Sequence, residues 1–301
     1  MDPIYYIDRA TGQKKQELVL GEKALAYLYG GSSFGHLIQT IVSKSPLVSK
    51  IYGFFQNLPL SKGKVAPFIK KYHIDTSIFE KKVEDFTSFN DFFIRKLKKS
   101  ARPIDPREKT AVLPADGRFL FFPNITLAKN FIVKGATFNL GQFLNDEKLA
   151  KQYENGSLIL GRLCPVDYHR FHFPVAGVPG PARLINGYLY SVNPVAIKQN
   201  IGLLYQNKRY LTEIESDFFG KVLLVEIGAT MVGKIDQTYI PGTRVSKGDE
   251  KGYFAFGGSA VAILFEKERL VIDEDLLKNE GIETLCTMGE SLGIAPSVNT
   301  F

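Results

Sequence analysis

From about residue 111 to the C-terminus, the chain consists of short apolar segments, rich in β-branched residues and separated by glycine and proline. Segments of this kind, without long amphipathic stretches between them, are typical of β-strands joined by turns. Because 45% of the residues are hydrophobic, the chain can bury a full core. The pattern therefore predicts a β-rich core over residues 111–301, with antiparallel or mixed strands. The clearest predicted strands are Ser157–Leu163, Ala182–Tyr190, Lys221–Ile227 and Met231–Ile235.

Residues 1–110 differ from this β-strand pattern, because their apolar residues recur at helical spacing. Ser45 and Pro46 suit the N-cap and first position of a helix, whose apolar stripe continues to Pro59. An N-terminal helical region followed by a β core gives the predicted fold class, α+β. Two shorter helices are expected at Ala24–Tyr29 and Leu37–Val42.

A further helix is predicted to begin at Ser88, where a serine N-cap followed by Asp91 can satisfy free backbone N–H groups. Apolar residues continue to Leu97, and the basic residues around this end suit a helix C-terminus. The proline-broken stretch Ala101–Pro106 is predicted to be a linker between the helical region and the β core.

The net charge of +7 is concentrated near the N-terminus. Residues 1–110 hold 19 basic and 11 acidic side chains, whereas residues 111–301 hold 19 and 20. A basic region favours a polyanionic partner, either nucleic acid or an anionic bilayer surface. The amphipathic helices favour the membrane, and no nucleic-acid-binding motif is recognisable. The alternative is that the apolar stripes pack on the rest of the protein.

Two further features bear on where the protein works. No segment approaches the roughly 20 apolar residues that cross a bilayer, and the first residues lack the apolar stretch of a secretory signal. Membrane association is therefore expected to be peripheral. The two cysteines, Cys164 and Cys286, provide no disulfide framework and fit a reducing compartment.

Two of the four histidines lie in one stretch, Leu163–Pro174, directly after a predicted strand. His169 and His172 occur there with an aspartate, a tyrosine and an arginine, a density of polar groups that suggests a functional loop. One interpretation is a metal site formed by Cys164, His169 and His172. A fourth ligand is not evident, so we predict no metal; polar packing within the loop is the other alternative.

The apolar segment Phe254–Phe265 is interrupted by Gly257, Gly258 and Ser259. Adjacent glycines weaken a strand and usually mark a bend or a close backbone approach. The hydrolase elbow G-x-S-x-G leads from a strand into a helix, whereas here an apolar strand follows Ser259. Attack of the Ser259 hydroxyl on the preceding carbonyl fits better, since Gly258 tolerates the backbone strain that such a step needs.

Several motifs, taken in order along the chain, resemble those of the phosphatidylserine decarboxylases, a family of pyruvoyl enzymes. Each motif is weak alone, but their order and spacing over nearly the whole chain make the resemblance specific. The motifs are YIDRATG, SFNDFFIRKLK, RPID, PADG, PVDYHRFHFPVAG, LYSVNP, EIGATMVG and KGDEKGYFAFGGSAVAILF.

The resemblance implies that the proenzyme cuts its own chain between Gly258 and Ser259. The products would be a long β chain, 1–258, and a short α chain, 259–301, which stay together as a heterodimer. Ser259 would become a pyruvoyl group at the new N-terminus, so that the covalent cofactor, a pyruvate unit, derives from the chain itself.

The resemblance also implies roles for individual residues. Asp116, His172 and Ser259 would form the self-cleavage triad, in which His172, oriented by Asp116, takes the hydroxyl proton. The substrate amine would then form a Schiff base with the pyruvoyl group and lose carbon dioxide. His169 is the candidate for the acid that returns a proton.

The implied substrate is phosphatidylserine in an anionic membrane, and the product is phosphatidylethanolamine. The basic N-terminal region then gains a role, because it would dock the protein on the cytoplasmic face of the cell membrane. Arg170 and nearby lysines are candidates for binding the lipid phosphate. Neither a nucleic acid nor a metal is implied, and assembly of the heterodimer into a homo-oligomer is left open.

One residue departs from the family pattern, because Ala260 stands where the family usually has serine or threonine. Two alternatives to a self-processing decarboxylase therefore remain at this point. The first is an uncut, inactive homologue that still binds membranes. The second is a serine hydrolase that uses Asp116, His172 and Ser259 on external esters.

Overall fold

The structure is a computed structural model of the chain. The structure describes residues 3–18, 27, 43–127, 139–199, 202–230, 234–279 and 281–297. The two helices expected at Ala24–Tyr29 and Leu37–Val42 lie outside the described residues, except for Tyr27. The first three residues of the strand expected at Met231–Ile235 also lie outside them.

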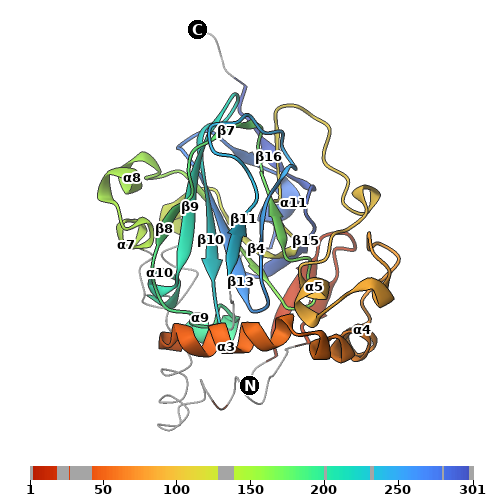
Figure 1. Ribbon diagram of the computed structural model, residues 1–301. Coiled ribbons are helices and arrows are strands. Elements are labelled where there is room, and N and C mark those ends of the chain that lie inside the picture. Colours follow the sequence, from red (N-terminus) through yellow and green to blue (C-terminus); the bar gives the residue numbers. More distant parts are fainter. Residues whose placement is uncertain are drawn as a thin grey trace.

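A ten-stranded sheet forms the centre of the molecule (Figure 1). All of its strand pairs are antiparallel except that between β1 and β15, which is parallel. The strands follow one another as β2 (Lys14–Gln16), β1 (Tyr5–Asp8), β15 (Glu283–Cys286), β4 (Gly117–Phe122), β5 (Ser157–Leu163), β13 (Ser259–Phe265), β10 (Gly220–Gly228), β9 (Arg209–Ser216) and β7 (Gly177–Pro179), and β8 (Arg183–Ile185) also pairs with β9.

Two three-stranded sheets complete the β structure. The first runs in the order β11 (Ile235–Gln237), β12 (Glu250–Phe254) and β6 (Arg170–His172). The second runs in the order β14 (Val271–Ile272), β16 (Ser291–Ile294) and β3 (Thr110–Val112).

Helices are short and lie around the sheets (Figure 1). The α-helices are α3 (Pro46–Asn57), α4 (Val65–Tyr72), α5 (Phe89–Phe93), α7 (Leu140–Leu144), α8 (Glu147–Gln152), α9 (Pro194–Gln199), α10 (Gly202–Gln206) and α11 (Glu274–Leu277). Single 3₁₀ segments occupy Pro59–Lys64, Val83–Asp85, Lys99–Ala101 and Ile125–Leu127. None of the helices in the described part is long and apolar enough to cross a bilayer.

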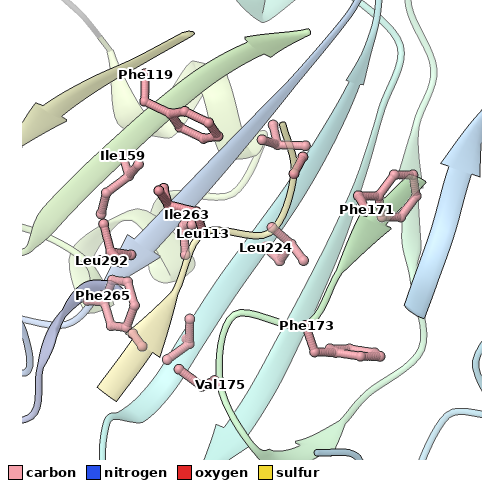
Figure 2. Packing of buried hydrophobic residues seen from close by; sticks show 14 of the residues in the cluster. Leu113, Phe119, Ile159, Phe171, Phe173, Val175, Leu224, Ile263, Phe265 and Leu292 are labelled. Atoms are coloured by element: carbon pink, nitrogen blue, oxygen red, sulfur yellow. The ribbon is translucent and has the colours of Figure 1, made fainter. Parts of the chain in front are cut away.

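The core lies on both faces of the large sheet, and β13 is buried along its whole length. Side chains alternate between the faces of a strand, so Val261 and Ile263 belong to one hydrophobic cluster and Ala260 and Ala262 to another. Figure 2 shows part of the first cluster, in which Ile263 lies among residues from neighbouring strands and loops. Burial on both faces explains why β13 is a continuous apolar run rather than an alternating one.

Several elements agree with the sequence predictions, and the mixed α+β architecture is confirmed. β5 has the predicted bounds, and β10 extends the predicted strand, Lys221–Ile227, by one residue at each end. α3 begins at Pro46 as predicted. The prediction Ala182–Tyr190 is correct only in part, because β8 covers Arg183–Ile185.

The prediction of a helical N-terminal region is confirmed only in part: α3, α4 and α5 lie within residues 1–110, but β1 and β2 join the large sheet. Tyr6 pairs with Glu283 and Ile7 with Thr284, more than 270 positions along the chain. Pairing at this separation is decided by tertiary contacts, which the local periodicity of the first residues does not reveal. The boundary between regions 1–110 and 111–301 stays a prediction.

The helix at Ser88 is also shorter than predicted. The serine hydroxyl accepts the N–H of Asp91 at 3.1 Å, which confirms the cap. The helix ends at Phe93 rather than near Leu97, because the following residues leave the helix to pair with an earlier segment. Leu97 forms a bridge with Phe79, and the N–H of Lys98 donates to Ile78.

Candidate active site

Ser259 is the first residue of β13 and lies between two partner strands. It is opposite Gly228 of β10 and Leu163 of β5. Its side chain is fully buried, and its Oγ atom finds no hydrogen-bond partner among the described residues. A buried hydroxyl without a partner is unfavourable for stability, so this position is a candidate for chemistry.

The bend before Ser259 is held by backbone hydrogen bonds. The N–H of Ala229 donates to the carbonyl oxygen of Gly258 at 3.1 Å, and the N–H of Gly258 donates to Thr230 at 3.1 Å. The residue that requires glycine is Gly257, with φ of 142°. A Cβ on Gly258 would approach no atom closer than the Ala229 Cβ, at 3.7 Å. The left-handed backbone thus lies at Gly257, and the tolerance of strain expected of Gly258 during self-attack stays a prediction.

Helix α5 holds the same bend from outside the sheet. The Asn90 Oδ1 atom accepts the N–H of Phe256 at 3.0 Å. The Phe256 ring packs on Phe93, with centroids 4.8 Å apart, and on Phe89 at 5.3 Å. No sequence pattern indicated this role for Asn90, Phe89 and Phe93, although they belong to the SFNDFFIRKLK motif. They place the Gly-Gly-Ser bend at a defined position relative to α5.

His169 lies beside this bend and is fully buried. Its ring stacks on Phe93 with centroids 3.8 Å apart, and its carbonyl accepts the N–H of Phe254 at 2.9 Å. Burial, reinforced by the nearby Arg95 guanidinium, lowers the pKa of His169 to about 3. The carbonyls of Cys164 and Pro165 favour the protonated ring, but neither ring nitrogen has a partner at hydrogen-bonding geometry among the described residues. The ring is therefore neutral at pH 7.

His172 is the last residue of β6 and is also buried. Its Nδ1 atom lies 3.0 Å from the carbonyl oxygen of Gly248, so that Nδ1 carries the proton of this hydrogen bond. Burial lowers the pKa of His172, although the Gly248 carbonyl and the charges of Glu250 and Asp116 oppose this. The neutral ring consequently keeps a free electron pair on Nε2, which has no partner among the described residues.

Asp116 lies close enough to His172 for its charge to favour the protonated ring. Its hydrogen bonds go elsewhere: Arg102 Nε donates to Oδ1 at 2.8 Å, and the N–H of Met288 donates to the same oxygen at 2.9 Å. The structure brings the two segments together through the N–H of His172, which donates to Pro114 at 2.8 Å. Orientation of His172 by Asp116 stays a prediction, because the bond recorded at Nδ1 is to Gly248.

Residues of the predicted linker, Ala101–Pro106, contact the residues of this site. Arg102 forms a two-pronged ion pair with Asp116, and Ile104 fills the space beside Gly248. The RPID motif contains both residues, yet nothing in its spacing indicates the carboxylate that Arg102 binds.

The loop before His169 is clamped by two buried arginines. Arg95 Nη2 donates to the carbonyls of Val166 and Asp167, each at 3.0 Å, and Arg118 Nη1 donates to the Asp167 carboxylate. Burial lowers the pKa of Arg95 to about 10, so the guanidinium remains charged at pH 7. The clamp fixes the approach of the chain to His169.

The metal interpretation gains no support from Cys164. Its Sγ atom lies 3.1 Å from Arg162 Nη1 and 3.0 Å from Glu17 Oε1. Burial raises the pKa of this thiol, which keeps it protonated and a poor ligand. Among the described residues, no group of three or more His, Cys, Asp or Glu side chains is arranged to hold a metal ion.

Arg170, predicted to bind the lipid phosphate, is already occupied. Its Nη1 atom lies 2.8 Å from both carboxylate oxygens of Glu250, and its Nε donates to Ile94 at 2.9 Å. An arginine whose charge is neutralised in this way is a weak candidate for an anion site.

Comparison with known proteins agrees with the motifs. The family model described as phosphatidylserine decarboxylase matches residues 89–294. A phosphatidylserine decarboxylase proenzyme of Chlamydia caviae is 47% identical over 295 residues, which cover 97% of this chain and 98% of the relative. The proenzyme of Fusobacterium nucleatum is 46% identical over 294 residues, with the same shares covered. The chain belongs to the phosphatidylserine decarboxylase family.

Proposed function

We propose that the protein decarboxylates phosphatidylserine to phosphatidylethanolamine and carbon dioxide, after cutting its own chain between Gly258 and Ser259. The observation that carries this proposal is the buried, unpartnered Ser259 hydroxyl next to a carbonyl that accepts the Ala229 N–H. A nucleophile without other partners and a carbonyl polarised by a donor are what an intramolecular attack needs.

Self-cleavage begins with proton removal from Ser259. We assign this step to His172, whose buried ring is neutral and has Nε2 free. The charge of Asp116 stabilises the imidazolium that forms. The Ser259 Oγ atom bonds to the Gly258 carbonyl carbon, and the negative charge on the carbonyl oxygen is stabilised by the Ala229 N–H. The C–N bond then breaks, His172 returns the proton to the amine, and an ester links the two chains.

Elimination completes the processing. Loss of the Cα proton of residue 259 expels the Gly258 carboxylate and leaves a dehydroalanine. Its tautomer reacts with water, which releases ammonia and leaves a pyruvoyl group. The products 1–258 and 259–301 would remain a heterodimer, because all seven residues of β13 pair with β5 on one side and β10 on the other.

Position 259 would hold the pyruvoyl group, whose carbonyl would supply an electrophile for the substrate amine and an electron sink for decarboxylation. The residues around position 259 fit this group, since the described side chains there are buried and exclude bulk water. His169 is our candidate for returning a proton to the substrate carbon. Its stacking on Phe93 fixes the plane of the ring.

Ala260, which departs from the family pattern of serine or threonine, is compatible with self-cleavage. Ala260 belongs to the hydrophobic cluster on one face of the sheet, whereas Ser259, as its neighbour along the strand, faces the other. A hydroxyl at position 260 would therefore point away from the side of the sheet on which Ser259 lies. We expect the alanine to leave the self-cleavage chemistry intact.

The proposed activity is tested by following carbon dioxide release from carboxyl-labelled phosphatidylserine in detergent micelles. We expect release to depend on enzyme concentration and to be abolished by phenylhydrazine, which reacts with the pyruvoyl carbonyl. An uncut chain that a fluorophosphonate labels at Ser259 would instead establish the hydrolase alternative. A cut enzyme that releases no carbon dioxide would contradict the assigned substrate.

We place the protein at the cytoplasmic face of the cell membrane, docked through α3. Phe54 and Phe55 of this helix are 62% and 55% exposed, and Leu60, just beyond its end, is 92% exposed. Lys50 lies one helical turn before Phe54, and Lys62 follows Leu60 by two residues. An apolar stripe with a basic edge favours an anionic bilayer surface.

The double variant Phe54→Ser, Phe55→Ser is expected to lower binding to phosphatidylserine-containing vesicles by at least about tenfold, because each ring buried in the bilayer contributes roughly 1.5–3 kcal/mol. The measurement is sedimentation with vesicles at fixed lipid concentration. Val271→Ser, which removes a 52% exposed apolar side chain on β14, is the matched control and should bind as the wild type does. Equal binding by the double variant would rule out docking through α3.

A further inference from the structure

A small cationic pocket lies where α3 meets the end of β10. Its volume is about 220 Å³, smaller than a whole ligand pocket but adequate for one polar group of a larger ligand. Figure 1 shows α3 running across this end of the large sheet. The pocket is lined by Ser43, Ser49, Lys50, Asn186, Gly187, Leu189, Lys208, Gly228, Lys234 and Ile235.

The pocket opens on the same face of the sheet as the Ser259 side chain. Gly228, in its wall, is the register partner of Ser259. Directly opposed residues of an antiparallel pair point to the same face, with Cα atoms roughly 5 Å apart. A Cβ on Gly228 would meet Leu189 at 3.2 Å and Ile235 at 3.5 Å, which are also pocket residues. The pocket therefore begins one strand away from the reacting residue.

The charges of the pocket are positive and largely uncompensated. Among the residues that the structure describes, it is lined by Lys50, Lys208 and Lys234 and by no carboxylate. Among the described residues, Lys234 has an ion pair, with Asp236, whereas no carboxylate lies within ion-pair distance of Lys50 or Lys208. The Lys208 ammonium lies 5.9 Å from the Tyr210 ring centroid. The backbone N–H of Lys208 donates to the Tyr188 carbonyl at 2.9 Å, and the Lys208 carbonyl accepts the N–H of Gly228 at 2.9 Å. These two hydrogen bonds hold Lys208 beside Gly228.

Ser49 provides an independent sign of a ligand. It is only 2% exposed, lines the pocket, and its Oγ atom has no hydrogen-bond partner in the part of the chain that the structure describes. A buried hydroxyl normally has a partner, and a phosphate oxygen would satisfy this one while neutralising the lysines.

A second pocket near position 259 is mostly apolar. It has a volume of about 270 Å³ and is lined by Ala260, Leu160 and Ile197, among others, and also by Lys14, Arg162 and Glu283. The Arg162 guanidinium is already ion-paired with Glu283. Ala260 points to the opposite face of the sheet from Ser259. The cationic pocket is therefore the one that shares a face with the reacting group.

We propose that Lys208, with Lys50 and the Ser49 hydroxyl, binds the phosphate ester of the substrate head group. This proposal rests on the decarboxylase function proposed above. A phosphate held there would leave the serine amine and carboxylate to reach position 259 across one strand spacing. The same pocket would accept free inorganic phosphate, so the test must separate the two sources.

The first measurement uses the uncut Ser259→Ala chain, in which the pocket can be tested without any chemistry. Binding of glycerophosphoserine, serine and inorganic phosphate is followed by calorimetry. We expect glycerophosphoserine to bind more tightly than serine. A second substitution, Lys208→Gln, should weaken its binding about tenfold, as expected when one hydrogen bond to a charged group is lost. Lys208→Arg should restore binding, and Lys267→Gln, beyond the far end of β13, should leave it unchanged.

The second measurement uses the cleaved enzyme and two soluble substrates, short-chain phosphatidylserine and a serine alkyl ether without phosphate. We expect Lys208→Gln to raise KM about tenfold for the first substrate alone, with kcat unchanged, since the contact is the same in ground and transition states. Equal KM changes for both substrates, or none, would overturn the proposal. Phosphate binding without any change of KM would assign the pocket to free phosphate and also overturn it. A wild-type chain that never cuts itself would refute the proposed function, while the calorimetry would still decide whether the anion site exists.

Discussion

Replacing Ser259 by alanine is expected to leave one intact chain of 301 residues and to abolish decarboxylase activity. The substitution removes only the Oγ atom, which has no hydrogen-bond partner in the described structure, so the fold should be unaffected or slightly stabilised. Without that oxygen, the ester cannot form and no pyruvoyl group can arise. The effect is therefore complete loss of both processing and catalysis rather than a reduced rate.

Intact mass spectrometry of the purified protein provides the measurement. The wild type should give fragments 1–258 and 259–301, and the short fragment should carry a pyruvoyl group in place of an N-terminal serine. Ser291→Ala is the matched control, because it removes another buried, unpartnered hydroxyl from the same short fragment. Cleavage of the Ser259→Ala chain at the same bond would refute the mechanism. If the wild type itself stays intact with membranes present, Ala260→Thr would show whether that residue prevents processing.

The variant His172→Asn is expected to slow self-cleavage by about 10²–10⁴-fold, the usual contribution of a positioned general base. Asparagine retains a side-chain donor toward the Gly248 carbonyl but cannot take the Ser259 proton. The rate is measured on freshly translated chain by following the appearance of the two fragments on a denaturing gel. His73→Asn is the matched control, since His73 is exposed and asparagine tolerates its left-handed backbone, with φ of 51°.

The pH dependence of cleavage follows from the burial of His172. Burial lowers its pKa, and the neutral ring is the form that accepts a proton. The cleavage rate should therefore be constant above the ordinary histidine pKa of about 6.5 and should fall only at lower pH. A rate that still rises between pH 7 and 8, or an unchanged rate in His172→Asn, would exclude His172 as the base.

Family membership and the proposed cleavage position were accessible from local sequence. The break at Gly257-Gly258-Ser259 is visible because two glycines interrupt an apolar strand, and the structure places a bend there, between β12 and β13. β5, β10 and the start of α3 were predicted for a similar reason, since periodicity and capping act over a few residues. In these elements the local preference and the tertiary environment agree.

Tertiary structure alone decided how the site is assembled. Three contacts join residues from separate motifs. Arg102 forms an ion pair with Asp116, Asn90 accepts a hydrogen bond from Phe256, and the His172 ring contacts the Gly248 carbonyl. Spacing along the chain carries no information about such pairs, because each depends on how the sheets and helices pack. For that reason the contacts of Arg102 and Ile104 with the site could not be predicted from the proline-rich stretch before residue 107.

The sequence by itself determined the α+β class, the family and the residue at which the chain is expected to cut, because these depend on local patterns and short motifs. Only the tertiary structure decided that β1 and β2 join the core and that the glycine requirement falls on Gly257. It also decided that Lys50 of α3 and Lys208 line one pocket with Gly228, the register partner of Ser259. The physical reason is the same in each case. Backbone pairing and pocket formation between distant segments arise from packing, and the sequence of a single segment does not determine their free energies.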